Sequence, residues 1–143
     1  WEEKIRFKTV ADVTGGHNGI ETRVGIAYTE GVANRGMTLQ QFVNITSANA
    51  ARIFGMYPRK GAIAPGSDAD ITIIDPLINR KLTMDDLHLE DYSIWEGFDV
   101  AGWPTTTLLR GKVAVDGGKL LGSAGDAQFL KRSISSEITS NPV

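Results

Sequence analysis

The sequence predicts an α+β fold in which helices come first and strands come later. Residues 20–56 have apolar positions at helical spacing together with helix-capping residues. Residues 71–74 and 105–115 are instead rich in β-branched residues and are punctuated by glycine and proline. A run of helices followed by a run of strands favours a layered α+β arrangement over alternating α/β units. So few strands make a thin sheet, which we expect to need partner strands from elsewhere to close a sandwich.

The composition is typical of a soluble globular protein. Hydrophobic residues make up 41% and charged residues 22% of the 143 residues, and the net charge is -2. This charge gives no reason to expect nucleic acid or an anionic membrane as a partner. There is no cysteine, and no apolar run approaches the ~20 residues that span a bilayer. Because the sequence opens on Trp1 without a starter methionine or a signal peptide, we expect a fragment, with a trimmed independent domain as the alternative.

The first predicted helix follows a glycine-rich loop at residues 14–19, where glycine lets the backbone approach a ligand closely. It begins near Ile20 and ends at Asn34-Arg35-Gly36. Glu21 at its start would favour the positive end of the helix dipole, with substrate contact as the lesser alternative. Its apolar stripe comprises Ile20, Val24, Ala27, Tyr28 and Val32.

Two shorter helices are expected next. Thr38 and Gln41 have the spacing of a capping box. Ser47 is a candidate cap for a separate helix at residues 48–54, which Gly55 and Pro58 end. The inward-facing side chains of the first of these helices are expected to be Leu39, Phe42 and Val43.

The strand region contains one short strand and one hairpin. Residues 71–74 predict a buried strand that Asp75-Pro76 ends. Residues 105–109 and 112–115 predict two strands joined by Arg110-Gly111, and a second tight turn at residues 116–118 leads into Leu120-Leu121. The aromatic side chains Trp95, Phe98 and Trp103 are interpreted as core. The tail beyond residue 122, with its apolar pair Phe129-Leu130, is expected to pack loosely or against a neighbour.

The residues do not offer a self-contained metal centre. Hydrolytic zinc needs three or four ligands, and the sequence has only His17 and His88, far apart. His88 is interpreted as a solvated or strand-face side chain, and His17 either faces a ligand or bonds to loop backbone. Asp68 and Asp70 fall on one face of a strand, which allows a paired acid-base role, but a turn-stabilising role for Asp68 is the preferred interpretation.

Several segments together resemble the dihydropyrimidinase and hydantoinase family of cyclic amidohydrolases, in the amidohydrolase superfamily. The run Gly66-Ser67-Asp68-Ala69-Asp70 marks the superfamily, and its combination with residues 57–61 and with Gly102-Trp103-Pro104 marks the hydantoinase-like branch. The other matching segments are residues 19–23, 46–55, 91–92, 96–97, 110–113 and 129–132.

The resemblance implies a division of the chain. Residues 1–58 would be the C-terminal end of a (β/α)8 barrel, carrying a substrate loop and the last helices. Residues 59–122 would be strands of a small β-sandwich, and residues 123–143 a C-terminal tail. The family's binuclear metal centre, usually zinc, and its catalytic aspartate lie upstream of Trp1, so that no catalytic or metal-ligating residue is assigned to this chain.

One functional element falls inside the chain. In the family, a Pro-Asn-Gly loop holds the cyclic amide through backbone groups, and Thr14-Gly15-Gly16 matches it here. Gly15, Gly16 and His17 are therefore the implied substrate-binding residues. Gly15 stands in place of the family's asparagine, which keeps a backbone contact but removes a side-chain role. His17 and Asn18 replace the usual Leu-Pro, and residues 125–128 replace a more basic pattern.

The function implied is hydrolysis of the amide bond in hydantoin or dihydropyrimidine rings by a complete enzyme, with this chain alone inactive. The implied partners are the missing N-terminal portion, a small cyclic amide and further copies in a homo-oligomer, with no nucleic acid or membrane, in the cytoplasm. Two alternatives stay open, namely a non-catalytic assembly or scaffold protein of the same fold and a free-standing binding module. The presence or absence of metal ligands among the residues that precede Trp1 would distinguish the enzyme from the scaffold protein. Cooperative folding of the isolated chain would favour the binding module.

Overall fold

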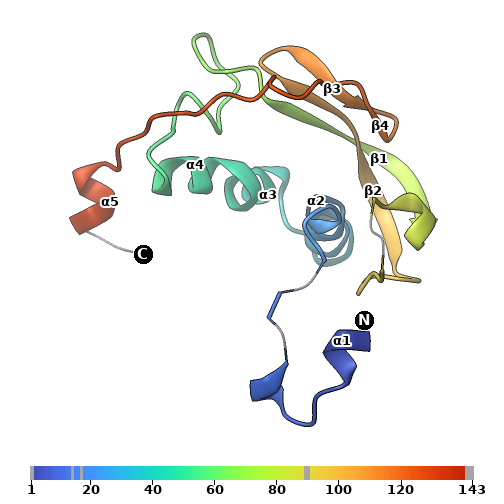
Figure 1. Ribbon diagram of the computed structural model, residues 1–143. Coiled ribbons are helices and arrows are strands. Elements are labelled where there is room, and N and C mark those ends of the chain that lie inside the picture. The colour runs from blue at the N-terminus through green and yellow to red at the C-terminus, as the bar shows by residue number, and fades with distance from the viewer. Residues whose placement is uncertain (1, 14, 17, 89–90, 141–143) are drawn as a thin grey trace.

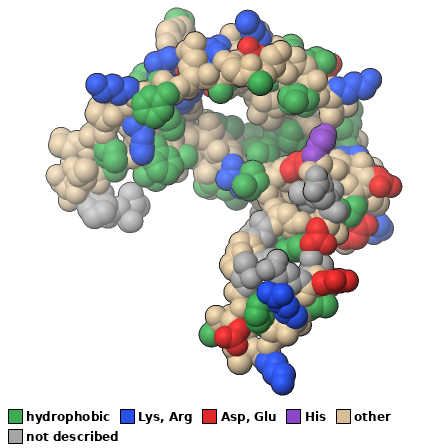
Figure 2. Space-filling model, viewed as in Figure 1, with side chains coloured by type: hydrophobic (Ala, Val, Ile, Leu, Met, Phe, Trp, Pro, Cys, Tyr) green, Lys and Arg blue, Asp and Glu red, His purple; other side chains and the backbone are tan. Residues whose placement is uncertain are grey.

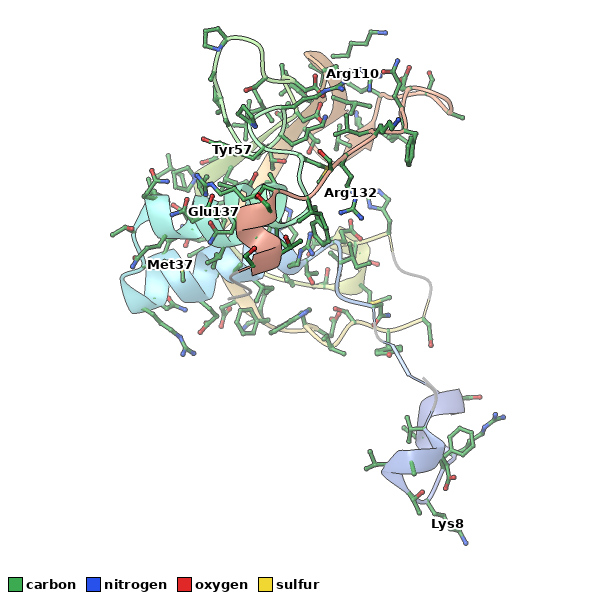
Figure 3. All side chains as sticks on the ribbon, turned by 90° about the vertical axis from the view of Figure 1, so that its left-hand side faces the viewer. Lys8, Met37, Tyr57, Arg110, Arg132 and Glu137 are labelled. Carbon is green, nitrogen blue, oxygen red and sulfur yellow. The ribbon has the colours of Figure 1, made fainter. Side chains whose placement is uncertain are left out.

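The computed structural model describes residues 2–13, 15–16, 18–88 and 91–140, and it has the predicted order of helices before strands (Figure 1). A first segment holds the short helices α1 (Glu2–Ile5) and η1 (Val10–Asp12). This segment, which carries Lys8, lies apart from the rest of the chain in both ribbon views (Figures 1 and 3). The remainder is an α+β unit in which helices face one side of a twisted antiparallel sheet.

The first long helix joins α2 (Arg23–Ala27) to the π-helical segment η2 (Tyr28–Asn34). It begins three residues later than predicted, and the predicted stripe is wrong at Ile20, which is 83% exposed. The face buried most deeply comprises Thr22, Gly25, Ile26 and Thr29, which is also a helical spacing. Small side chains are on this face because the helix packs directly against strand β2.

The second long helix is continuous through α3 (Leu39–Val43), the π-helical η3 (Asn44–Ala48) and α4 (Asn49–Ile53). The capping box is confirmed, since Thr38 Oγ1 accepts from Gln41 N at 3.2 Å and Gln41 Oε1 accepts from Thr38 N at 2.9 Å. Ser47 lies inside this helix, so the prediction that it caps a separate helix is wrong. Gly55 ends the helix with a φ of 67°, as predicted.

The inward face of this second helix is narrower than expected. Phe42 is 5% exposed and meets Tyr28 edge to face at 5.6 Å between ring centroids. Leu39 and Val43 are 61% and 45% exposed, so the prediction that they face inward does not hold for this chain. Figure 2 shows other hydrophobic side chains exposed along the helices.

The sheet has four antiparallel strands in the order β1 (Ile71–Lys81), β2 (Asp99–Leu109), β3 (Lys112–Asp116) and β4 (Lys119–Leu120). Both predicted turns are confirmed, and Arg110 and Gly111 take left-handed φ values of 47° and 80° between paired Leu109 and Lys112. Strand β1 is longer than predicted because it continues through Pro76 at an irregularity between Asp75 and Asn79. The prediction that residues 71–74 are buried is wrong, since Ile71 and Ile74 are half-buried and Thr72 and Ile73 are exposed. A short 3-10 helix, η4 (Met84–Asp86), lies in the connection from β1 to β2.

A small core joins the first helix to the sheet. Ile26, Leu82 and Val100 are buried together, and the half-buried Trp95, Phe98 and Trp103 pack against them. The prediction that these aromatic side chains belong to the core is therefore confirmed.

The tail runs from β4 back to the helices and ends in the short helix α5 (Ser136–Ser140) beside α4 (Figures 1 and 3). Arg132 Nη1 donates to Phe54 O at 3.2 Å, and its guanidinium lies over the Phe54 ring. Phe129 is 95% exposed, in keeping with the loose packing predicted for it. Within the described ranges no helix combines the length and apolarity needed to cross a bilayer.

Candidate functional site

The predicted substrate segment lies just before the first long helix. Gly15 and Gly16 are exposed, and Gly16 has a φ of 83°, a conformation that favours glycine. A Cβ on either residue would meet no atom of its described surroundings within 4 Å, so neither position is a glycine because of close packing at its Cβ. Thr14 and His17 lie outside the described residues, and the role of His17 stays a prediction.

Two side chains tie the end of this segment to the connection between β1 and β2. Asn18 Nδ2 donates to the carbonyl of Tyr92, while the buried Asn18 Oδ1 has no hydrogen-bond partner among the described residues. Glu21 accepts from His88 N at 2.9 Å through Oε2 and from His88 Nδ1 at 2.7 Å through Oε1. Glu21 thus lies before the helix cap instead of in its first turn, and it is bonded to a residue 67 positions away.

Thr22 separates this segment from the helix. It is 1% exposed, and its Oγ1 donates to Gly19 O at 3.2 Å. The chain therefore turns into α2 at a buried residue; before it, Gly15, Gly16, Ile20 and Glu21 are exposed and Asn18 and Gly19 are half-buried.

The helix is fixed to strand β2 by two reciprocal close approaches. A Cβ on Gly25 would meet Cε3 and Cζ3 of Trp103 at 2.3 Å, so the indole occupies the space that a side chain on the helix would need. A Cβ on Gly102 of the strand would meet Cδ1 and Cε1 of Tyr28 at 2.5 Å, and Gly102 also has a φ of 86°. Each element therefore has a glycine that receives an aromatic ring of the other.

Thr29 bonds the same two elements through polar atoms. It is 1% exposed, its Oγ1 donates to Gly25 O at 2.8 Å, and the same oxygen accepts from Ala101 N at 3.1 Å. The helix that follows the substrate segment is thus fixed to the sheet by packing and hydrogen bonds.

A cavity of about 530 Å³ lies beside this joint, between the start of the helix and the sheet. The Arg80 guanidinium lies over the Trp103 ring at 5.3 Å and donates through Nη1 to Asp86. The Asp86 carboxylate also accepts a hydrogen bond from Thr83 N. The Arg80 Nε is buried and has no partner in the part of the chain that is described. Among the lining residues are Glu21, Arg80, Asp86, His88, Trp103 and Thr105.

The two aspartates of the glycine-rich signature are engaged in ion pairs. Lys60 Nζ lies 2.9 Å from Asp68 Oδ2 and also bonds to Asp70, and Arg59 Nε donates to Asp68 Oδ2 at 3.0 Å. Arg110 N donates to Asp70 Oδ1 at 2.8 Å, which ties the signature to the β2–β3 turn. This arrangement is a clamp between a loop and a sheet, so the preference for a structural role of Asp68 holds, through ion pairs with Arg59 and Lys60. The expectation that Asp68 and Asp70 lie on a strand is wrong, since β1 begins at Ile71.

The charges shift one another's titration. The Lys60 and Arg59 hydrogen bonds hold the pKa of Asp68 below its ordinary value. Burial alone would raise the pKa of Asp70, but hydrogen bonds from Lys60 and from Arg110 N outweigh it and lower that pKa. Burial would likewise lower the pKa of Lys60, and its bonds to Asp70 and Asp68 raise it instead.

The described residues do not form a metal centre. No group of three or more His, Cys, Asp or Glu side chains comes together within residues 2–13, 15–16, 18–88 and 91–140. The binuclear metal that the family resemblance implies does not fit the side chains described here, and no chemical step is derived through it.

Comparison with known proteins agrees with the resemblance. The model of the amidohydrolase family matches residues 3–114, so the chain belongs to that family. Within it, the proteins similar to this chain include hydantoinases. The D-hydantoinase of Geobacillus stearothermophilus is 42% identical over 115 residues, which are 80% of this chain and 24% of that protein. The D-hydantoinase of Ralstonia pickettii is 44% identical over 121 residues, 84% of this chain and 26% of that protein.

Solved structures show the same likeness. D-hydantoinase from a Bacillus sp. AR9 matches with a TM-score of 0.83 and 42% identity, over 88% of this chain and 28% of that one. The D-hydantoinase (dihydropyrimidinase) from Thermus sp. matches with a TM-score of 0.85 and 38% identity, over 92% and 29%. The chain thus spans about a quarter of the length of the curated relatives it matches.

Sequence reasoning missed the contacts that hold the substrate segment. The partners of Asn18, Glu21 and Thr29 lie 67 to 74 positions further along the chain, and no local pattern pairs them. The one available signal was the placement of small residues at 25 and 29 on a helix. Spacing of this kind indicates a close approach to another element.

Proposed function

We propose that this chain is the C-terminal part of a metal-dependent hydrolase that opens the ring of a cyclic amide of hydantoin or dihydropyrimidine type. The observation that carries the proposal is the combined likeness to hydantoinases, at 42% identity in sequence and a TM-score of 0.83 in structure. Fold similarity alone would not carry a function, but identity at this level over 80% of the chain supports a shared chemistry.

In this proposal residues 1–58 complete a (β/α)8 barrel, residues 59–122 contribute to a β-sandwich, and residues 123–143 form a tail. The metal centre, with zinc as the proposed metal, is held by residues outside this chain. The complete protein is a cytoplasmic homo-oligomer. No observation favours a scaffold function, and it is not proposed here.

The chain's own part in the reaction is to hold the substrate. Gly15 and Gly16, with His17, present backbone groups to the ring amide, and the two glycines carry no side chain that would keep a planar ring away from the backbone. Backbone N–H and C=O groups recognise a cyclic amide because the ring itself offers one donor and one acceptor side by side. Such contacts orient the ring carbonyl for attack and need no side chain at residue 15.

The test is a panel of substrates with the complete protein. Ring opening of hydantoin and of dihydrouracil is followed by loss of ultraviolet absorbance, with acyclic amides as the control class, before and after removal of metal by a chelator. We expect turnover of cyclic amides that chelation abolishes and added zinc restores. A metal-loaded, folded complete protein that opens neither ring would refute the proposed function.

A further inference from the structure

Asn18 and Glu21 stand between the glycine pair and the first helix, and both reach to the β1–β2 connection. Asn18 Nδ2 bonds to Tyr92 O, and Glu21 bonds to both the backbone N and the ring Nδ1 of His88. Because an ionised carboxylate only accepts, the ring contact forms with the His88 tautomer that has its proton on Nδ1. Three hydrogen bonds thus join Asn18 and Glu21 to Tyr92 and His88 of the distant connection.

The connection is firmly held at both of its ends. Leu82 is fully buried in the core, Leu82 N donates to Phe98 O at 2.8 Å, and Gly97 N donates to Leu82 O at 2.8 Å. Trp95 and Phe98 stack edge to face at 5.2 Å between their centroids. The three bonds therefore link the glycine segment to a part of the chain whose ends are packed into the core.

The helix does not depend on these bonds for its own position. Thr29, Gly25 and the Trp103 ring fix it to β2 from the other side of Thr22. Loss of Asn18 or Glu21 would therefore loosen the segment that precedes Thr22 and leave the helix and the core in place. A purely structural role would instead appear as a loss of stability.

From this asymmetry we propose that Asn18 and Glu21 are positioning residues that hold the Gly15-Gly16 backbone in the geometry that binds the cyclic amide. They set the affinity for substrate without touching it. This inference rests on the proposed function, and it adds the β1–β2 connection to the machinery that determines substrate affinity.

The experiment compares four variants of the complete protein in steady-state ring opening of hydantoin, with thermal unfolding measured in parallel. Asn18→Ala and Glu21→Ala remove the ties. Glu21→Gln is the conservative variant, because its amide oxygen still accepts from His88 N. Glu30→Ala is the matched control. Glu30, in the first long helix, has 34% side-chain exposure against 32% for Glu21, but its partners Asn34 and Arg35 are local, four and five positions along the chain.

We expect KM to rise about five-fold in Asn18→Ala, the effect of one net hydrogen bond on an equilibrium, and at least as much in Glu21→Ala, which removes two bonds. The kcat and the unfolding temperature should stay near those of the unmodified protein. Glu21→Gln should recover part of the affinity, and Glu30→Ala should leave KM unchanged.

Unchanged KM values in Asn18→Ala and Glu21→Ala would overturn this inference. The proposed function would still stand in that case, provided that the unmodified protein opens the ring. An equal rise of KM in Glu30→Ala, or a fall in unfolding temperature without a change in KM, would overturn it as well. An unmodified, metal-loaded protein that opens no cyclic amide would refute the proposed function, and this inference with it.

Discussion

Replacement of Gly25 by alanine tests the joint between helix and sheet. In most helices Gly→Ala stabilises by about 1 kcal/mol, because alanine has the higher helix propensity. Here the new Cβ would lie 2.3 Å from two carbon atoms of Trp103, whereas ordinary van der Waals contact begins near 3.4 Å. The indole would have to retreat by the difference, 3.4 - 2.3 = 1.1 Å.

That retreat is opposed on two sides. Trp103 packs against the cluster of Ile26, Leu82 and Val100, and the Arg80 guanidinium lies over its ring at 5.3 Å. Overpacking of this kind costs roughly 1–3 kcal/mol, occasionally more. Set against the propensity gain, we expect Gly25→Ala to lower the free energy of unfolding by up to about 2 kcal/mol.

The assay is urea unfolding of the complete protein, with Gly31→Ala as the matched control. Gly31 lies in the same helix, but its added Cβ would lie 3.1 Å from Cε and Sδ of Met37, the mobile end of a flexible side chain. Gly31→Ala should therefore be neutral or stabilising by up to about 1 kcal/mol. Trp103→Leu should also cancel part of the Gly25→Ala penalty in a double-mutant cycle. If Gly25→Ala stabilises as much as Gly31→Ala, the reasoning about this joint is wrong.

Three further predictions concern the ion-pair clamp, the tail and the capping box. Folding lowers the pKa values of Asp68 and Asp70, so the stability that these carboxylates contribute is present above the ordinary pKa of about 4 and is lost as pH falls below it. Asp70→Asn should therefore flatten the fall in unfolding temperature between about pH 5 and pH 3. An unaltered dependence of unfolding temperature on pH would count against the clamp. The raised pKa of Lys60 has the opposite sign, and its stabilisation is lost only as pH rises above about 10.4. Gly55→Ala should raise the rate at which a protease cleaves the tail, because the added Cβ would lie 2.1 Å from Ser133 O. Gly36→Ala is the control, since Gly36 has a similar φ of 70° and its added Cβ would meet no atom within 4 Å. It should leave the cleavage rate unchanged. Thr38→Ala should lower the free energy of chemical unfolding by about 1 kcal/mol, because it removes the capping box. Thr46→Ala is the control and should be near neutral, because the Thr46 hydroxyl donates back to Phe42 O inside the helix. Equal losses in the two variants would contradict the assigned role of Thr38.

Local signals predicted the parts of the fold that neighbouring residues determine. The turn at Arg110-Gly111 and the capping box of Thr38 and Gln41 each depend on a few adjacent residues, and both were predictable. Strand β1 was predicted too short because Pro76 looks like an end, whereas pairing with β2 carries the strand on to Lys81 across an irregularity.

The candidate site was predictable only in part. The residue types of the glycine segment indicate a place where the backbone can approach a ligand closely, and its role in substrate binding stays a prediction. The ties of Asn18 and Glu21 could not be found, since their partners Tyr92 and His88 come together only through the fold. The buried face of the first helix was misplaced for a similar reason, as Gly25 and Thr29 are buried by strand β2 and not by their own hydrophobicity.

We propose a division of labour between this chain and the rest of a hydantoinase-like enzyme. The direct measurement is metal-dependent ring opening of hydantoin by three purified samples, namely the complete protein, the same protein without the segment 1–143, and this chain alone. We predict turnover in the first sample and none in the other two. Turnover by the chain alone, or undiminished turnover by the protein that lacks it, would contradict the account.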